Sequence, residues 1–335
     1  MSDPFARLDA SERELLQPAR AGFVAPMLAT LTDDRFSDPA WIYERKLDGI
    51  RFVAARDGSG AHLWSRSEHS LDATYPELVD AVAEQVRPGT VVDGEIVAFD
   101  GARTSFERLQ GRSGLHDAAA ARASGIPVFG YVFDAVVVDG HDITALPLRR
   151  RKALLRAAVT AGGPIRLSPH RNGAGAELLA DACARGWEGL IAKRADAPYR
   201  PGRRSPDWLK LKCVHAQELV IGGWTDPEGS RTGLGALLVG YYDGGDLRYA
   251  GKVGTGFDRH VLDDLASRMR GLAADEPPFA ETVRDRGVHW VRPELVAQIG
   301  FGEWTRDGRL RHPRYLGLRE DKAPEDVVRE EASCR

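Results

Sequence analysis

Short runs of alternating apolar and polar residues, separated by Asp-Gly and other glycine-rich turns, constrain this chain more than any other sequence feature. The stretch "WIYERKLDGIRFVAARDGSGAHLWSR", residues 41–66, alternates on both sides of a turn at Asp57 and Gly58. A period of two is the pattern of a strand with one buried face, and Asp-Gly favours a hairpin turn. Residues 90–100 and 128–140 also read as strands. We therefore expect antiparallel sheets in the first part of the chain.

Helical patterns lie between these strands at 74–86 and 175–186, so the first part is mixed α+β. After about residue 214 the pattern changes: 218–257 contains three strand patterns, 258–272 a helix and 289–305 strands again. Several short strands with one inserted helix are typical of a small β-barrel of the OB type. We expect four segments: a leader at 1–21, a first domain at 22–214, an OB-type domain at 215–322 and a frayed tail at 323–335.

The composition is that of a globular protein. The 335 residues are enough for two domains, since typical domains have roughly 100–200 residues. No uninterrupted apolar run approaches the roughly 18 residues of a membrane span, and the charged start lacks the apolar core of a secretory signal. We therefore expect no membrane association and a cytoplasmic location. Cys183, Cys213 and Cys334 show no C-x-x-C spacing, so neither a disulfide framework nor a zinc ribbon is indicated.

Basic residues are concentrated locally, although the net charge of −3 by itself argues against a nucleic-acid partner. The stretch 199–212 has five lysine and arginine residues against one acid, and 306–322 has six against three. Within the first, Arg204 either contacts a DNA phosphate or balances Asp207. The stretch 148–156 begins an amphipathic helix whose basic residues either are solvated or contact phosphate.

Lys46 ends a strand and begins a K-x-D-G-x-R pattern that includes Asp48 and Arg51. Strand geometry places Glu44 on the same face as Lys46. A lysine nucleophile in nucleotidyl transfer needs cations for the phosphates, hard oxygen ligands for Mg²⁺ and a slot for the base. Taken alone, the pattern also fits a strand that ends in a turn with solvated charges. The rest of the sequence decides between these readings.

Further motifs follow in order along the chain. They are "SRS" with Arg66, "DGEIVAFD" with Glu95, "YVFDAVVVDG" with Phe133, "EGLIAKR" with Glu188 and Lys193, and "DWLKLK" with Lys210 and Lys212. The series resembles the covalent nucleotidyltransferase superfamily of polynucleotide ligases and messenger-RNA capping enzymes. Within it, residues 26–322 are most similar to bacterial ATP-dependent DNA ligases, especially the ligase domain of the end-joining enzyme ligase D. The resemblance implies a nucleotidyltransferase (ATP-grasp-like) adenylation domain of antiparallel sheets and helices, followed by an OB-fold β-barrel.

The same resemblance implies a role for each residue. Lys46 becomes covalently linked to AMP, and the other catalytic residues are Asp48, Arg51, Lys210 and Lys212. The nucleotide contacts are Arg51 and Arg66 for phosphate or ribose, Glu95 for the ribose hydroxyls, Phe133 for adenine stacking, Glu44 for the exocyclic amine, and Lys193. Glu188 and Asp48 are the metal contacts, while Arg204, Asp321 and Lys322 contact DNA or pyrophosphate. The competing interpretations are a strand-edge acid for Glu95, plain core for Phe133 and an exposed helix-exit charge for Glu188.

The implied activity is that of a three-step DNA ligase that uses ATP with Mg²⁺ or Mn²⁺ to seal nicked double-stranded DNA, in repair, recombination or non-homologous end joining. Rivals are a GTP-using capping enzyme, an RNA ligase, and a non-catalytic nucleic-acid-binding protein. A NAD-dependent ligase is disfavoured because that family's zinc-binding cysteine set is missing. Relatives often carry polymerase and nuclease domains, for which the leader is too short. Candidate partners are therefore a separately encoded polymerase or nuclease and a Ku-type end binder, and we expect a nucleoid-associated monomer.

Overall fold

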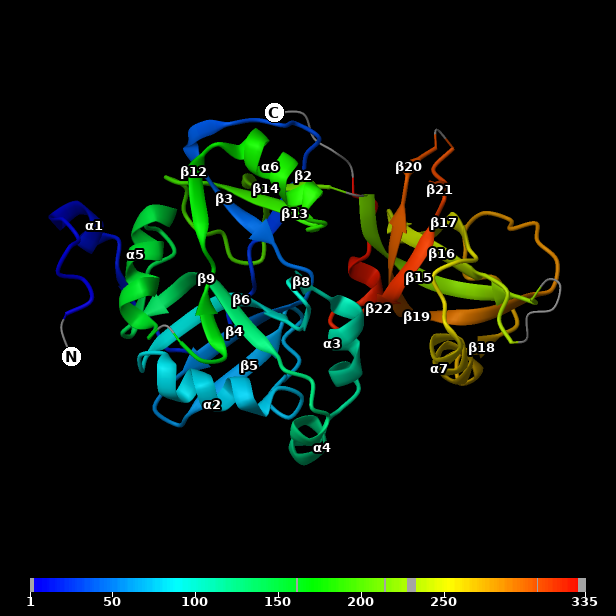
Figure 1. Ribbon diagram of the computed structural model, residues 1–335, viewed down its shortest axis with the longest axis horizontal. Helices are drawn as coiled ribbons and strands as arrows, with labels where there is room; N and C mark the ends of the chain where they lie inside the picture. Colours follow the sequence, from blue (N-terminus) through cyan, green and yellow to red (C-terminus); the bar gives the residue numbers. More distant parts are fainter. Residues whose placement is uncertain (1–2, 161, 214, 228–232, 306, 331–335) are drawn as a thin grey trace. The chain divides into compact units, whose positions relative to one another are not determined.

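The computed structural model describes residues 3–160, 162–213, 215–227, 233–305 and 307–330 (Figure 1). Contacts divide these residues into two compact units, the first ending at Cys213 and the second continuing to Glu330. Each unit is described by itself. Part of the stretch that resembles DNA ligases, residues 228–232, lies outside the described residues, as do residues 331–335 of the predicted tail.

The first unit contains a seven-stranded sheet whose strands follow the order β1-β10-β9-β6-β4-β5, with β11 beside β9. All neighbours are antiparallel except β11 and β9. One face packs against α2 and α5, in a core where Phe52 and Val132 meet Leu78 and Leu154. The strands are β1 (Gln17–Pro18), β4 (Ile50–Arg56), β5 (Ala61–Ser65), β6 (Thr90–Val97), β9 (Phe129–Val138), β10 (His141–Asp142) and β11 (Ile165–Leu167).

The second sheet of this unit has the order β12-β3-β13-β14-β2. Helix α6 covers one face, where Leu179 packs with Trp41, Tyr43 and Leu190. The predicted alternation of residues 41–46 is therefore confirmed, because Trp41 and Tyr43 face the helix and Glu44 and Lys46 point to the opposite side. The strands are β2 (Leu28–Leu31), β3 (Asp38–Lys46), β12 (His170–Gly173), β13 (Gly189–Arg194) and β14 (Arg204–Lys212).

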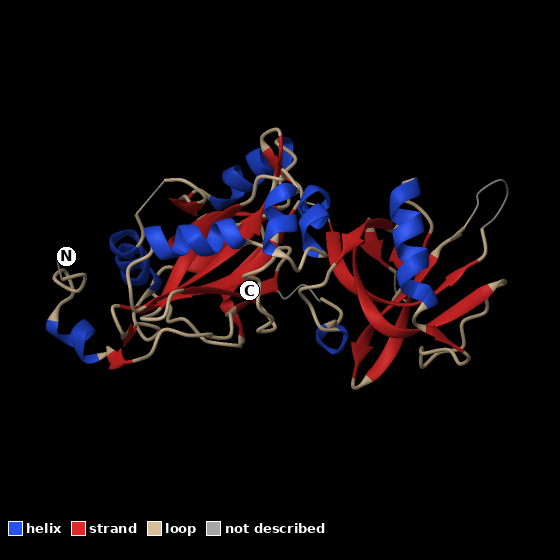
Figure 2. Ribbon diagram, turned by 90° about the horizontal axis from the view of Figure 1, so that it is seen from below, coloured by secondary structure: helices blue, strands red, loops and turns tan. Residues whose placement is uncertain are grey.

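Helices flank both sheets of the first unit, as Figure 2 shows. The expected hairpin at Asp57 and Gly58 joins β4 to β5, and the expected helices correspond to α2 and α6. The helices are α1 (Ala10–Glu14), α2 (Pro76–Gln85), α3 (Phe106–Ser113), α4 (Ala118–Ala123), α5 (Leu148–Ala158) and α6 (Gly175–Ala184), and a small two-stranded sheet consists of β7 (Phe99–Asp100) and β8 (Arg103–Thr104).

The N-terminal segment is part of the first unit, so the prediction of a separate leader at 1–21 is wrong. Phe5 and Leu8 are buried in the main core, and β1 pairs with β10. Asp9 and Glu12 form a reciprocal capping box at the start of α1, and Glu12 also pairs with Arg150 of α5. Two apolar side chains among many charges are enough to attach the segment to the core, which average polarity does not reveal.

The second unit is built on a six-stranded sheet with the order β17-β16-β15-β19-β18, in which β22 also pairs with β19. Helix α7 packs on it through Leu265 and Met269, so the expected inserted helix is present. The elements are β15 (His215–Thr225), β16 (Leu237–Asp243), β17 (Asp246–Val253), α7 (Arg259–Arg270), β18 (Ala273–Ala274), β19 (Val288–Phe301), β20 (Glu303–Trp304), β21 (Leu310–Arg311) and β22 (Arg314–Leu318).

The described part of the predicted frayed tail is ordered against the second unit, which corrects that prediction. Pro324–Asp326 form a 3₁₀ turn, and the next residue, Val327, is fully buried. The carbonyl of Val327 accepts a 2.7 Å hydrogen bond from the amide of Tyr242, and Gln217 donates to the carbonyl of Val328. Here the buried Val327 attaches the segment to the second unit.

Cys183 and Cys213 form a disulfide, although their spacing gave no indication of one. Cys183 lies in α6 and Cys213 follows β14, and their Cα atoms are 5.3 Å apart. The two residues are 30 positions apart in sequence and meet because α6 packs over this sheet. Such a pairing depends on tertiary geometry and has no short-range sequence signal. Cys334 lies outside the described residues.

Gly189, at the start of β13, is a position that only glycine fits. Its φ is +145°, and a Cβ atom would lie 2.0 Å from the carbonyl oxygen of Leu211. We expect Gly189→Ala to lower the free energy of unfolding by about 1–3 kcal/mol, because backbone strain is added to a clash with a central strand. Chemical denaturation measures the change. Gly58→Ala is the control, since nothing lies within 4 Å of its Cβ position, and equal stability losses in both variants would contradict the account.

Candidate active site

Three neighbouring strands place three of the predicted catalytic residues, Lys46, Lys210 and Lys212, on one face of the second sheet. Lys46 on β3 is opposite Gly189 on β13, which is opposite Lys212 on β14. Two residues further along, Glu44 and Lys210 occupy matching positions on either side of Ile191. Residues that are opposite each other in antiparallel strands project to the same face. Lys46, Lys210 and Lys212 therefore project to the side away from α6.

Lys46 is surrounded by acidic groups. Its ammonium forms an ion pair with Glu188, the residue immediately before β13. Burial alone would lower the pKa of Lys46, but the carboxylates of Glu188, Asp48 and Glu95 together raise it. The amine is therefore held as an ammonium here, and it must lose both its proton and the ion pair before it can act as a nucleophile.

Glycine allows the turn after Lys46 to approach the first sheet. A Cβ atom at Gly49 would lie 2.1 Å from the carbonyl oxygen of Ile96, so a larger residue would push the turn away from β6. The close approach brings Glu95 of β6 within electrostatic range of Lys46. Gly49 of the K-x-D-G-x-R pattern thus has a packing role, in addition to the role predicted for Asp48.

Asp48 and Glu188 provide oxygen donors that fit a divalent cation. Asp48 also accepts a 3.3 Å hydrogen bond from the amide of Phe106 at the start of α3, which fixes the position of its carboxylate. Among the described residues, no group of three or more His, Cys, Asp or Glu side chains forms a preassembled metal cage. Mg²⁺ in proteins usually takes one or two carboxylates and completes its shell with water and substrate phosphates, so these two residues fit it.

Arg51 on β4 is held by the first sheet. Its guanidinium forms a bidentate pair with Asp93, at 2.5 and 2.6 Å, and Tyr199 donates a 2.7 Å hydrogen bond to the same carboxylate. Asp93 and Tyr199 are buried and had not been predicted as site residues. Asp93 belongs to the D-G-E motif that contains Glu95, so its position in that motif was a usable signal. The phosphate or ribose role of Arg51 stays a prediction.

Phe133 lies in the core, as one of its two interpretations expected, and its role in adenine stacking stays a prediction. It is only 8% exposed and belongs to a core cluster with Trp208, so it is a core residue. Two cations also lie over its ring: the Arg51 guanidinium is 4.6 Å and the Lys193 ammonium 4.0 Å from the ring centre. Trp208 is buried, and the Lys193 ammonium also lies 4.0 Å from its ring centre.

Lys193 and Lys152 enclose the carboxylate of Glu44. Lys193 is 2.8 Å from one carboxylate oxygen, and Lys152 of α5 pairs with the other. For stretch 148–156 we expected basic residues that either are solvated or contact phosphate. Neither interpretation holds for Arg151 and Lys152, because both are buried. Lys152 was missed because the helical pattern does not show which basic residue faces inward.

Four other predicted residues, Arg66, Arg204, Asp321 and Lys322, are described by their local surroundings. Arg204 donates to the carbonyl of Ala29, whereas Asp207 pairs with Arg200, so the interpretation of Arg204 as the partner of Asp207 is wrong. Arg66 follows β5 at the end of the hairpin. In the second unit, Asp321 forms a bidentate pair with Arg319 at 2.8 Å, and Lys322 is 3.2 Å from Glu218.

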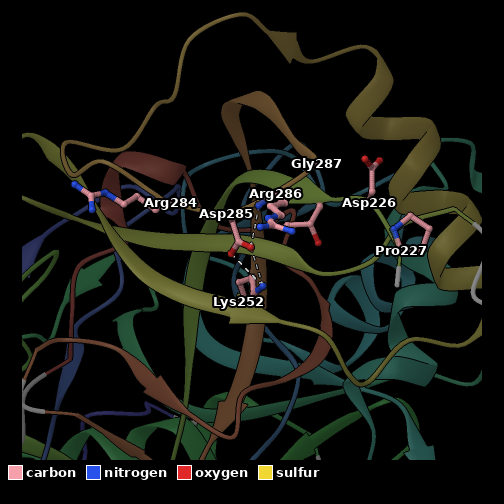
Figure 3. A pocket seen from close by; sticks show the side chains of 8 residues that line it. Asp226, Pro227, Lys252, Arg284, Asp285, Arg286 and Gly287 are labelled. Carbon is pink, nitrogen blue, oxygen red and sulfur yellow. Dashed lines mark hydrogen bonds and ion pairs between the residues drawn. The ribbon is translucent and has the colours of Figure 1, made fainter. Parts of the chain in front are cut away.

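A separate hollow of about 760 Å³ lies in the second unit (Figure 3). It is lined by Thr225, Asp226, Pro227, Lys252, Arg284, Asp285, Arg286 and Gly287. Lys252 and Asp285 are 3.0 Å apart, and Asp226 pairs with His289, so much of the charge is already balanced. None of the predicted site residues belongs to it. Among the described residues, no helix is long and apolar enough to span a bilayer.

The fold and the polar face fit the covalent nucleotidyltransferases that the sequence resembles: the half-buried Lys46 pairs with Glu188 and shares its face with Lys210 and Lys212. Residues 26–212 match the ATP dependent DNA ligase domain, and residues 230–322 match the ATP dependent DNA ligase C terminal region. The chain belongs to the ATP-dependent DNA ligase family. The expected family and the expected two-part fold are therefore confirmed.

The relatives include large end-joining proteins. The chain is 37% identical over 313 residues to "Multifunctional non-homologous end joining DNA repair protein LigD" of Mycobacterium tuberculosis, covering 92% of this chain and 40% of that protein. It is 36% identical over 333 residues to LigD of Pseudomonas aeruginosa, covering 94% and 39%. A solved structure, "mycobacterial DNA ligase D complexed with ATP and MES", is similar to this chain, with a TM-score of 0.64 and 36% sequence identity. The match covers 92% of this chain and 98% of that one. The chain thus spans about two fifths of the length of these LigD proteins.

His170 is opposite Glu44 in the sheet, and its pKa depends on the burial and the charges of this face. Burial, followed by the positive charge of Lys152, lowers the pKa of His170 to about 4. A lowered folded-state pKa means that the unfolded chain binds a proton first, so stability falls as the pH drops from about 6.5 toward 4. We expect NMR titration to give a pKa near 4 and His170→Asn to flatten the pH dependence of the melting temperature over this range. Titration near 6.5 would contradict the described surroundings.

Proposed function

We propose that the chain is an ATP-dependent DNA ligase that seals nicks in duplex DNA through a covalent Lys46–AMP intermediate. The observation that carries the proposal is the register that aligns Lys46, Gly189 and Lys212 and brings Glu188 to the amine. The family match and the ATP named for the mycobacterial relative support ATP as the nucleotide.

In the first step, the Lys46 nitrogen forms a bond to the α-phosphorus of ATP and the bond to pyrophosphate breaks. Lys210 and Lys212 project from the same face and supply positive charge to the α-phosphate as it passes through the transition state. Mg²⁺ or Mn²⁺ held by Glu188 and Asp48 would supply further charge neutralisation. Glu188 must release the Lys46 ammonium, whose proton leaves to solvent or to a nearby carboxylate.

In this proposal, the base binds between the two sheets of the first unit. Phe133 offers its ring for stacking, and Glu44 offers carboxylate oxygens to the exocyclic amine of adenine. Glu95 on β6, whose charge acts on Lys46, would accept hydrogen bonds from the ribose hydroxyls. Arg51 on β4 and Arg66, which follows β5, would contribute cations. Lys193 keeps the Glu44 carboxylate paired.

In the second step, AMP passes from Lys46 to the 5′-phosphate at a nick, forming a pyrophosphate linkage. In the third, the 3′-hydroxyl attacks that phosphate, the phosphodiester bond forms and AMP leaves. The enzyme would hold DNA mainly through phosphates, with Arg204 in the first unit and Asp321 and Lys322 in the second contributing to contacts with DNA or pyrophosphate. Binding of this kind depends strongly on salt and weakly on base sequence.

The biological setting follows the relatives. LigD proteins are described as non-homologous end joining proteins, so end joining is the proposed pathway, in the cytoplasm and at the nucleoid. A Ku-type end binder and a separately encoded polymerase or nuclease are the proposed partners, as the resemblance to end-joining ligases implies.

Intact mass before and after incubation with ATP and Mg²⁺ tests the chemistry. We expect a gain of one AMP, reversal by pyrophosphate, and no gain with GTP. Lys46→Ala should abolish the adduct, because it removes the amine that pairs with Glu188 and is proposed to attack the α-phosphorus. Arg150→Ala on the exposed side of α5 is the control and should form the AMP adduct as the wild type does. A protein that takes up neither nucleotide, after pyrophosphate has removed any existing adduct, would instead be a binding protein.

We further expect a monomer. Sedimentation equilibrium of the DNA-free protein should give a mass near 36.6 kDa over a wide concentration range. A stable dimer under these conditions would overturn this part of the proposal.

A further inference from the structure

Lys152 is a buried charge outside the motifs that define the family resemblance. It lies on α5, is 4% exposed, and its ammonium pairs with the Glu44 carboxylate. The same ammonium donates a 3.0 Å hydrogen bond to the carbonyl of Phe133. One side chain thus joins β3 of the second sheet to β9 of the first, at the two residues proposed to contact the base. Figure 1 labels α5, β3 and β9.

The adjacent residue fixes the position of Lys152. Arg151 forms a bidentate pair with Asp134, with both contacts at 2.9 Å, and both side chains are fully buried. Arg151 also donates to the carbonyls of Leu146 and Ala197. Consecutive residues of α5 therefore bind consecutive residues of β9, since Arg151 holds Asp134 while Lys152 holds the Phe133 backbone. The helix cannot shift along the strand without breaking several buried polar contacts.

The charges around Glu44 preserve its character as an acceptor. Burial would raise the pKa of Glu44, but the ammonium groups of Lys152 and Lys193 lower it below its ordinary value. An ionised carboxylate has only acceptor sites, about four in all, so two lysines leave room for a donor from a ligand. A protonated Glu44 would instead offer a donor and would no longer distinguish an amine from a carbonyl.

We propose that Lys152 is a positioning residue for base selection: it ties the Glu44 carboxylate to the Phe133 backbone, so that an acceptor faces the base edge and an aminopurine is favoured. This inference rests on the proposed function and deepens it. Adenine has an amine at its 6-position, purine has only hydrogen there, and guanine has a carbonyl that the carboxylate repels. A site built to accept a hydrogen bond rejects an analogue that lacks the donor.

The test compares ATP with purine riboside 5′-triphosphate, which lacks only the 6-amine, in single-turnover formation of the Lys46 adduct followed by intact mass. For the wild type we expect kcat/KM to favour ATP by about tenfold or more, the usual size of a hydrogen bond to a charged group. In Lys152→Met this preference should fall toward one, mainly through a higher KM for ATP. Lys152→Arg, which keeps a cation and its donors, should retain most of the preference.

Matched controls separate positioning from general loss of structure. Arg150→Met changes a basic residue of the same helix that pairs with Glu12 at the surface, and it should leave both rates unchanged. If Lys152→Met does not fold, Lys152→Gln serves in its place, because the amide still donates to the Phe133 carbonyl but has no charge to hold Glu44 ionised. We expect Lys152→Gln to lose severalfold of the preference.

The outcomes are distinct. A Lys152 variant that remains folded and slows both nucleotides equally, with the preference unchanged, would make Lys152 purely structural and overturn the inference. A wild type that forms the adduct with ATP but shows no preference over the purine analogue would overturn the inference and leave the proposed ligase chemistry intact. A wild type that forms no adduct with either nucleotide would overturn both.

Discussion

The register of β3 against β13 and of β13 against β14 is the constraint on which the rest of the site depends. Side chains alternate with a period of two, so a slip of one residue would turn Lys46 into the apolar face and Tyr43 into the polar one. Packing of Trp41, Tyr43 and Leu190 against α6 prevents that slip. The hydrophobic effect on one face of the sheet thus positions the charges on the other, and no contact among those charges has to provide the alignment.

The charged side chains around the site are paired with groups of opposite charge. Lys46 pairs with Glu188, Arg51 with Asp93, and Glu44 with two lysines. Buried ion pairs of this kind contribute little net stability, because desolvation offsets their attraction, but they fix geometry. In the proposed reaction, a nucleotide with its divalent cation would redistribute these pairings, because Glu188 would bind the cation and release the amine of Lys46. The ammonium state of Lys46 in this structure is consistent with a nucleophile that is activated only when its substrate is present.

Local pattern accounts for the parts of the fold and site that the sequence predicted. The alternation at 41–46, the hairpin at Asp57 and the helix at 175–186 depend on neighbouring residues, and the motif residues are recognisable by their spacing. The parts that were missed depend on tertiary contacts. The disulfide of Cys183 and Cys213 joins segments that meet only when α6 packs on its sheet. Lys152 is one of several basic residues on α5, and only the packed helix shows that it faces Glu44. Phe5 and Val327 attach segments whose overall composition suggests loose ends.

The most direct measurement is a single turnover of nick sealing by protein already charged with AMP and freed of ATP. If Lys46 is the donor and a DNA 5′-phosphate the acceptor, each charged molecule should seal about one nick. The loss of the adduct mass should then equal the amount of sealed strand, and a nick without a 5′-phosphate should leave the adduct in place. A charged protein that keeps its AMP in the presence of a phosphorylated nick would contradict the account and require a different acceptor.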